Sequence, residues 1–161
     1  MYERLEALGI AFERHEHPPT FTVEEAEVHW AGIEATHCKN LFLRNQKNDR
    51  HCLVIVAHRK RVDLRGVASQ IGDGKLSFAS PERLMQYLGV APGSVSPLGL
   101  IADPECHVRV FLDRDLRSAK RISFHPNVNT VTVTMTFDDF ERFLTSTRHV
   151  VRYLTIGDMT K

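Results

Sequence analysis

The sequence predicts one α+β domain, in which short helices flank a mainly antiparallel mixed sheet with a curled, barrel-like form. Two observations support this prediction. The 161 residues are enough for one compact domain with a real core, and no internal repeat or Pro/Ser-rich linker divides them. Short segments with the alternation of strands are interspersed with segments that carry helix caps. We therefore expect residues 1–161 to form a single domain.

The amino-terminal part is predicted to contain two helices and a strand. Residues 2–8 form a short helix that Gly9 closes, and residues 11–17 form a strand. Thr22 and Glu25 then match a capping box, in which each side chain bonds the backbone amide of the other residue. This capping box predicts the start of the second helix.

The next two strands are predicted to pair as a hairpin. Residues 36–45 alternate between two faces, and residues 51–58 are almost continuously apolar, which is typical of a central strand. Lys39 shares its face with Leu41 and Leu43, two leucines that should point into a core. Burying an unpaired ammonium is costly, so a lysine at this position needs an explanation.

Two explanations for Lys39 are open at this point. Its stem can lie on apolar surface while the ammonium reaches water, or its charge can be held in a pocket for an anionic group or a polarised carbonyl. Asn40 points to the opposite face of an ideal strand. A bulge or a strand end would let both side chains serve one site.

Helix caps organise the middle of the chain. Asp63 is predicted to cap a helix that Gly72 stops, and residues 75–80 form a short strand. Ser80 followed by Pro81 predicts the start of another helix, because proline is favoured at the first helical position.

An irregular loop is predicted over residues 91–100. Gly93 and Gly99 would let the backbone approach a ligand, and Pro97 would fix the curve of the loop. An ordinary connection between two elements is the alternative.

The carboxyl-terminal part is predicted to be rich in strands. Residues 107–113 and 121–127 form two of them, and residues 129–136 alternate almost perfectly between threonines and apolar residues. Thr136 caps the last helix, and residues 149–156 form the last strand.

The composition excludes several classes of protein. No apolar run approaches the roughly 20 residues needed to span a bilayer, and the first ten residues do not resemble a signal peptide, so we expect a cytoplasmic protein without membrane contact. The three cysteines are odd in number and form no CxxC pair, which argues against a disulfide framework. The net charge of +1 does not favour bulk polyanion binding.

No strong general motif is present, and several weak signals have more than one interpretation. His37–Cys38 and His51–Cys52 could approach across the hairpin to bind a metal, although satisfied side chains explain them better. The basic segments 58–61 and 114–121 fit solvated loops, and a rim that contacts phosphates is the alternative. His125, before a proline, is either structural or the wall of a pocket.

Four of these segments occur together in one family. "HPPTFTVEEA", "CKNLFLRN", "GSVSPLGL" and "FHPNVNT" resemble, in this order and spacing, the YbaK/prolyl-tRNA-synthetase-associated domain family. The resemblance covers about residues 2 to 153. Within the family, the chain looks most like the free-standing prolyl-tRNA deacylases that remove alanine from tRNA(Pro).

The resemblance implies a set of site residues. Lys39 matches the essential lysine of the family, Asn40 is the residue beside it, and His125 lines the same pocket. Thr20 and Thr22 lie where the amino-terminal segment of the family borders that pocket. The loop around the aminoacyl end of the tRNA is matched by Gly93, Ser94, Val95, Ser96, Pro97, Leu98 and Gly99.

The function that the resemblance implies is hydrolysis in trans of the ester in Ala-tRNA(Pro), by an aminoacyl-tRNA deacylase that needs no metal or cofactor. Its partner would be the acceptor end of tRNA(Pro), with transient contact to prolyl-tRNA synthetase. Relatives that clear cysteine often carry phenylalanine and basic residues around the last glycine of the loop. Here Leu98 and Leu100 flank Gly99, which favours alanine. The alternatives are a Cys-tRNA(Pro) deacylase, a tRNA- or nucleic-acid-binding module without activity, and a structural adaptor.

Overall fold

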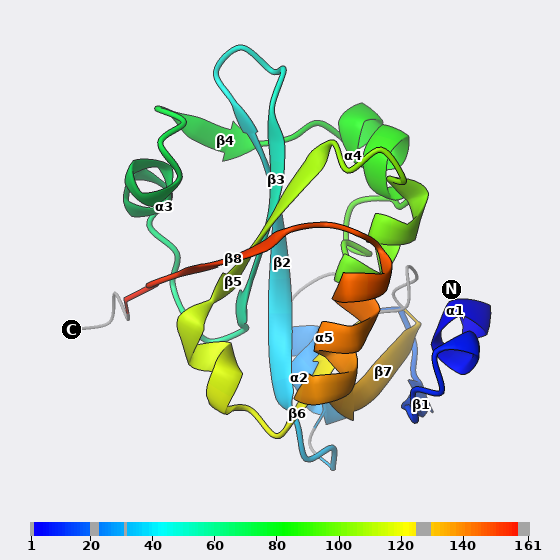
Figure 1. The fold of residues 1–161 in the computed structure, drawn as a ribbon. Helices are drawn as coiled ribbons and strands as arrows, with labels where there is room; N and C mark the ends of the chain where they lie inside the picture. Colours follow the sequence, from blue (N-terminus) through cyan, green and yellow to red (C-terminus); the bar gives the residue numbers. More distant parts are fainter. Residues whose placement is uncertain (1, 20–22, 31, 125–129, 158–161) are drawn as a thin grey trace.

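The computed structural model of the chain describes residues 2–19, 23–30, 32–124 and 130–157. In this part of the chain, helices lie against both faces of one sheet (Figure 1). The helices are α1 (Tyr2–Ala7), α2 (Val23–Trp30), α3 (Leu64–Ile71), α4 (Pro81–Leu88) and α5 (Phe137–Ser146), with the 3₁₀ helices η1 (Pro97–Ala102) and η2 (Arg114–Ser118). The strands are β1 (Glu13–Glu16), β2 (Thr36–Asn45), β3 (His51–Ala57), β4 (Leu76–Phe78), β5 (Val108–Asp113), β6 (Arg121–Phe124), β7 (Val131–Thr136) and β8 (Val151–Leu154).

The predicted helix caps are confirmed where the structure describes them. The side chain of Asp63 accepts a hydrogen bond from the Arg65 amide at the start of α3, and Gly72 ends that helix in the left-handed conformation. Ser80 and Thr136 cap α4 and α5 in the same way. The expected capping residue Thr22 lies outside the described residues.

The sheet departs from the expected form in two ways. Its strand order is β1-β7-β6-β2-β3-β5-β8, with β4 paired to β2, and the described strands do not close it into a barrel. The pairs β2–β6, β3–β5 and β5–β8 are parallel. Alternation within a strand shows which residues share a face, but it does not show which strand lies beside it, so the sequence could not supply these pairings.

Two apolar clusters cover the two faces of the central strands. The inner cluster packs Phe42 and Leu53 of the sheet against α1, α4 and α5. The outer cluster packs Leu43 and Val54 against α3 and β4. Because both faces are covered, β3 is buried along nearly its whole length, as its continuous apolar sequence predicted. No described helix has the length and apolar character required to cross a membrane.

The segment predicted as an irregular loop contains the short helix η1, so that prediction was wrong for its second half. Ser96 caps η1, since its hydroxyl accepts a hydrogen bond from the Leu98 amide at 3.1 Å. Pro97 occupies the first helical turn, where its missing N–H is not needed. A serine before a proline is the same signal that identified α4, and it could have identified η1.

Candidate active site around Lys39

Lys39 is the fourth residue of β2 and lies two positions after His37, which pairs with β6. It is half-buried and stands opposite Val56 of β3. Its ammonium has no hydrogen bond or ion pair with any described residue, and burial lowers the pKa of Lys39 from its ordinary value. An unpaired, partly desolvated cation is suited to bind an anionic group or a polarised carbonyl.

Asn40 connects the neighbouring position of β2 to the segment before η1. Its side-chain Nδ2 donates a hydrogen bond to the Val95 carbonyl at 3.1 Å. Its Oδ1 is buried and has no partner among the described residues. The bulge that would bring Asn40 and Lys39 to one face is absent, because the pairing of β2 with β3 is continuous from Cys38 to Arg44. The two side chains therefore leave the strand on opposite faces.

The predicted site loop, residues 93–99, divides into an exposed part and a buried part. Gly93 is exposed and has a φ of 90°, which favours glycine. Ser96 and Leu98 are fully buried in the structure, and Val95 is half-buried against the inner cluster. Of the predicted lining residues, Leu98 therefore contributes to the core, whereas Val95 keeps an accessible side.

Backbone amides of this loop differ in whether they are free to bind a ligand. The amides of Ser94, Leu98 and Gly99 donate to Ala91, Ser96 and Ser96 respectively. The amides of Val95 and Ser96 donate to no described residue. The amide of Gly99 is thus occupied within the loop, whereas the amides of Val95 and of the fully buried Ser96 have no described acceptor.

A group of aromatic and polar side chains beside Lys39 was missed from the sequence. His37 lies two residues before Lys39, and its ring stacks on Trp30 with ring centroids 4.3 Å apart. The Nδ1 of His58 donates a hydrogen bond to the His37 carbonyl at 3.1 Å, and its Nε2 lies 3.2 Å from the Glu27 carboxylate. Burial lowers the pKa of His37 to about 4, so this ring is neutral near pH 7. The period-2 rule, which puts His37 and Lys39 on one side of β2, could have identified it.

Three of the predicted site residues, Thr20, Thr22 and His125, lie outside the described residues. The described residues that flank them lie together, because β1 pairs with β7 and the His17 amide donates to the Thr130 carbonyl at 2.8 Å.

The two cysteine–histidine pairs do not meet, so the hypothesis of a metal bound between them is wrong. In the antiparallel register, Cys38 stands opposite Ala57 and His51 stands opposite Arg44, at the two ends of the hairpin. Among the described residues, no group of three or more His, Cys, Asp or Glu could hold a metal. Burial also raises the pKa of the Cys38 thiol, which makes it a poor nucleophile beside Lys39.

The basic segments are partly neutralised by acids of the same chain. Lys60 contacts Asp113 and Asp115, each at 2.6 Å. Arg121 lies 3.1 Å from Glu13, and Arg117 stacks on the ring of Tyr153. Most of these charges are therefore engaged within the fold, although Lys120 is exposed.

The fold and the site together define a class: a single α+β domain whose unpaired, half-buried lysine suits a ligand with anionic or carbonyl groups. Comparison with known proteins then gives the family. The model of the aminoacyl-tRNA editing domain matches residues 17–143, and the chain belongs to this family.

Individual relatives agree with this assignment. "Prolyl-tRNA editing protein ProX" of Acetoanaerobium sticklandii is 38% identical over 143 residues, which are 88% of this chain and 86% of that protein. "Prolyl-tRNA synthetase associated domain-containing protein 1" of Bos taurus is 36% identical over 151 residues, covering 91% and 88% of the two chains. A crystal structure described as a proposed trans-editing enzyme for prolyl tRNA synthetase has a TM-score of 0.69 at 25% identity, and the match covers 96% and 94%.

Proposed function

We propose that residues 1–161 act as one trans-editing hydrolase domain that deacylates mischarged tRNA(Pro), with Ala-tRNA(Pro) as the main substrate. The family and the relatives named for prolyl-tRNA editing support the reaction. The observation that carries the proposal is the half-buried ammonium of Lys39, which has no partner among the described residues. An adaptor without a ligand would not need an uncompensated charge at this position of β2.

In the proposed mechanism, Lys39 binds the terminal part of the tRNA. An ammonium at this position attracts the phosphate or the hydroxyl groups of the terminal adenosine. An anionic group beside Lys39 also offsets the desolvation that lowers its pKa, so ligand and lysine stabilise each other. Thr20, Thr22 and His125 are proposed to border the same pocket, as the resemblance implies.

The bond that breaks is the ester between the amino acid and the ribose. A water, activated by the neighbouring ribose hydroxyl, attacks the carbonyl carbon, and its proton passes to the leaving ribose oxygen. The amide of Val95, a half-buried residue of the loop, is the proposed donor to the developing oxyanion, since it has no described acceptor. Asn40 fixes Val95 for this task through its hydrogen bond to the Val95 carbonyl. The ester is already activated, so the mechanism needs no cofactor or protein nucleophile.

The proposed selection of alanine depends on size. A synthetase site cannot fully exclude a smaller amino acid, because a missing methylene discriminates by only about 1–3 kcal/mol. A second, smaller site excludes proline sterically and leaves the cognate Pro-tRNA(Pro) intact. Val95, half-buried in the loop of residues 93–99, is the described residue best placed to limit this volume.

A panel of charged tRNAs tests the proposal. Deacylation rates should be compared for Ala-tRNA(Pro), Ser-tRNA(Pro), Cys-tRNA(Pro) and Pro-tRNA(Pro), with alanine expected fastest, serine slower and proline near background. Equal rates for alanine and proline would contradict the size selection. Removal of cysteine without removal of alanine would identify the chain as a Cys-tRNA(Pro) deacylase, and binding without hydrolysis of any of them would leave a tRNA-binding module.

The proposed partners follow from the substrate. The chain would bind the acceptor end of tRNA(Pro), act in the cytoplasm where tRNA is charged, and contact prolyl-tRNA synthetase transiently as the mischarged product leaves.

A further inference from the structure

A cavity of about 440 Å³ opens at the amino-terminal ends of β5 and β8, away from Lys39. Four arginines line it, and we call it the basic groove. These arginines are Arg50, Arg109, Arg148 and Arg152, and Asp49 is the acidic residue among the described lining residues.

The strand register explains why these arginines share one face. Phe111 of β5 stands beside Arg152 of β8 in a parallel pair, so both side chains lie on the same face of the sheet. Arg109 is two residues before Phe111, and its guanidinium lies 5.7 Å from the centre of the Phe111 ring. In the described part of the sheet β8 is an edge strand, which leaves Arg152 exposed beside the groove.

The charge of the groove is only partly compensated. The carboxylate of Asp73, with 1% of its side chain exposed, contacts both Arg109 and Arg50. This pairing orients two guanidinium groups and leaves their other N–H groups available. Arg148 and Arg152 have no ion pair with any described residue. The groove is thus locally cationic, although the whole chain has a net charge of only +1.

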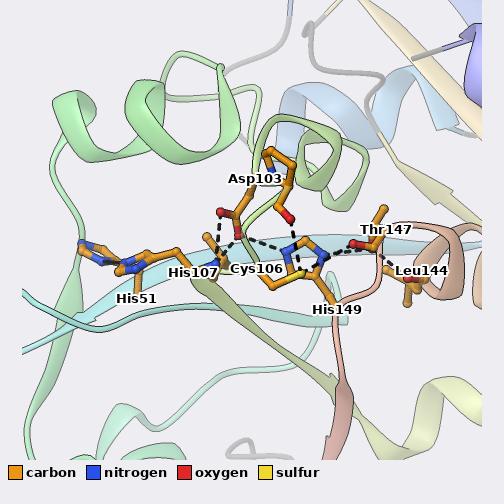
Figure 2. Close-up of polar contacts among 9 residues, drawn as sticks. His51, Asp103, Cys106, His107, Leu144, Thr147 and His149 are labelled. Carbon is orange, nitrogen blue, oxygen red and sulfur yellow. Dashed lines mark hydrogen bonds and ion pairs between the residues drawn. The ribbon is translucent and has the colours of Figure 1, made fainter.

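The end of the groove is built on a buried polar network (Figure 2). His149 Nε2 donates to the Asp103 carboxylate at 2.9 Å, and Asp103 also accepts from the amides of His107 and Val108. Figure 2 shows Asp103 between His107 and His149, with Cys106 beside them. The side chain of His149 is 1% exposed. This network fixes the two turns that carry the lining residues.

Backbone conformation in the same place is unusual. Cys106 and Arg148, both lining residues, have φ values of 57° and 67°. They are two of the three non-glycine residues with positive φ in the described chain. Such conformations cost free energy and persist only where the surroundings impose them. They hold Arg148 at the mouth of the groove.

We propose that the basic groove binds a phosphodiester of the tRNA backbone, at a distance from the ester that is hydrolysed. This inference rests on the proposed function, which makes tRNA the substrate. A guanidinium group matches the geometry of phosphate oxygens, which it binds with paired hydrogen bonds. Such contacts fix the position of a nucleic acid without reading its sequence.

The position of the groove suits a second contact with a large substrate. Arg109 stands beside Cys52 and Lys39 beside Val56, four residues further along β3, which is roughly 13 Å along the strand. Both side chains lie on the face that carries the outer cluster, because Cys52 and Val56 belong to that cluster. A free phosphate could reach only one of the two places, whereas a tRNA acceptor stem can reach both.

The test uses uncharged tRNA(Pro) and two arginines that take no part in the proposed chemistry. Arg148→Asn keeps a residue that tolerates positive φ, and Arg152→Gln keeps the length and polarity of an edge residue. Arg65→Gln is the matched control, because Arg65 is exposed on α3 and its side chain has no described partner. Circular dichroism and thermal melting should first show that all variants are folded.

Binding is then measured between about 50 and 200 mM salt. The double variant is expected to bind tRNA(Pro) about tenfold more weakly, and the slope of log K against log salt should fall by about 1.4–1.8 for two lost contacts. The control should match the wild type. In deacylation of Ala-tRNA(Pro), the double variant should raise KM and keep kcat. Unchanged tRNA affinity and salt slope in the double variant would overturn the inference.

Two further outcomes separate this inference from the alternatives. If inorganic phosphate raises the melting temperature of the wild type but not of the double variant, while tRNA affinity stays the same, the groove holds a free anion and the RNA assignment is wrong. Because the tRNA is uncharged, binding does not depend on hydrolysis. A wild type that binds tRNA(Pro) through these arginines but hydrolyses none of the four esters would refute the proposed function and support the groove.

Discussion

The sequence pattern identifies Lys39 as an unusual residue, but only the structure shows how far it is buried and whether it has a partner. Its charge on an apolar strand face was visible in the sequence, and the structure shows it half-buried with a pKa lowered by burial. Asn40 points to the opposite face, as the alternation of the strand predicted, and the unbroken register excludes the bulge that would have brought both side chains to one site. Asn40 instead positions Val95 from the other side of the strand.

Replacing Lys39 with alanine should remove most of the activity and leave the fold intact. An electrostatic donor to the reacting groups contributes about 100- to 1,000-fold to kcat, and we expect a loss of that size. The measurement is the deacylation rate of Ala-tRNA(Pro) alongside a thermal melt. Lys47→Ala, at an exposed lysine in the turn of the same hairpin, is the control and should keep the wild-type rate. An unfolded variant, or one with full activity, would show that Lys39 has a structural role and not a catalytic one.

At the scale of elements, the motif at residues 93–99 combines two roles, because η1 contributes to the core and the segment before η1 stays partly accessible. Leu98 belongs to the inner cluster with none of its surface exposed, whereas Val95 is half-buried. The sequence motif alone could not make this division, because both residues are apolar and only three positions apart.

Val95→Ala and Leu98→Ala should therefore have different effects. Val95→Ala should relax substrate selection, so that Ser-tRNA(Pro) or larger esters are hydrolysed faster relative to Ala-tRNA(Pro), with little change in stability. Leu98→Ala should lower the free energy of unfolding by about 2–5 kcal/mol, because it leaves a cavity in the core. Urea unfolding and the charged-tRNA panel measure the two effects. The division would be contradicted if Leu98→Ala changed selectivity while remaining as stable as the wild type.

The end of η1 is held to the turn between α5 and β8 by Asp103 and His149, 2.9 Å apart. Burial opposes ionisation of Asp103, but hydrogen bonds from His149 and from the Val108 and His107 amides outweigh it and lower the pKa of this carboxyl. A lowered carboxyl pKa stabilises the fold above the unfolded value of about 3.9. That contribution is lost as the pH falls through the folded value.

Asp103→Asn should accordingly reduce stability in a pH-dependent way. We expect the free energy of unfolding to fall by about 1–3 kcal/mol at pH 7, because the buried donors around Asp103 lose a charged acceptor oxygen. The difference from the wild type should shrink as the pH falls below about 4. Urea titrations across this range measure it. A difference independent of pH would mean that the carboxylate charge does not contribute.

At the scale of the whole molecule, local signals predicted the elements better than their arrangement. The caps at Asp63, Ser80 and Thr136 and the bounds of β2 are local, and the structure confirms them. The open mixed sheet, the buried network at Asp103 and the basic groove all depend on residues that are distant in sequence. His107 and Arg148 carry no motif, and only the parallel pairing of β5 with β8 brings their turns together.

The place of β2 in the sheet has a consequence for how the protein is made. β2 can pair with β3 and β4 soon after it leaves the ribosome, but its third neighbour, β6, begins only at Arg121. In the same way, β1 cannot pair until β7 has been synthesised. Contacts so far apart in sequence form late, because the intervening chain has to be ordered first. A nascent chain that ends before β6 therefore contains β2, the strand of Lys39, without one of its neighbouring strands. We expect hydrolysis to begin only after β6 and β7 have been synthesised and have paired with β2 and β1.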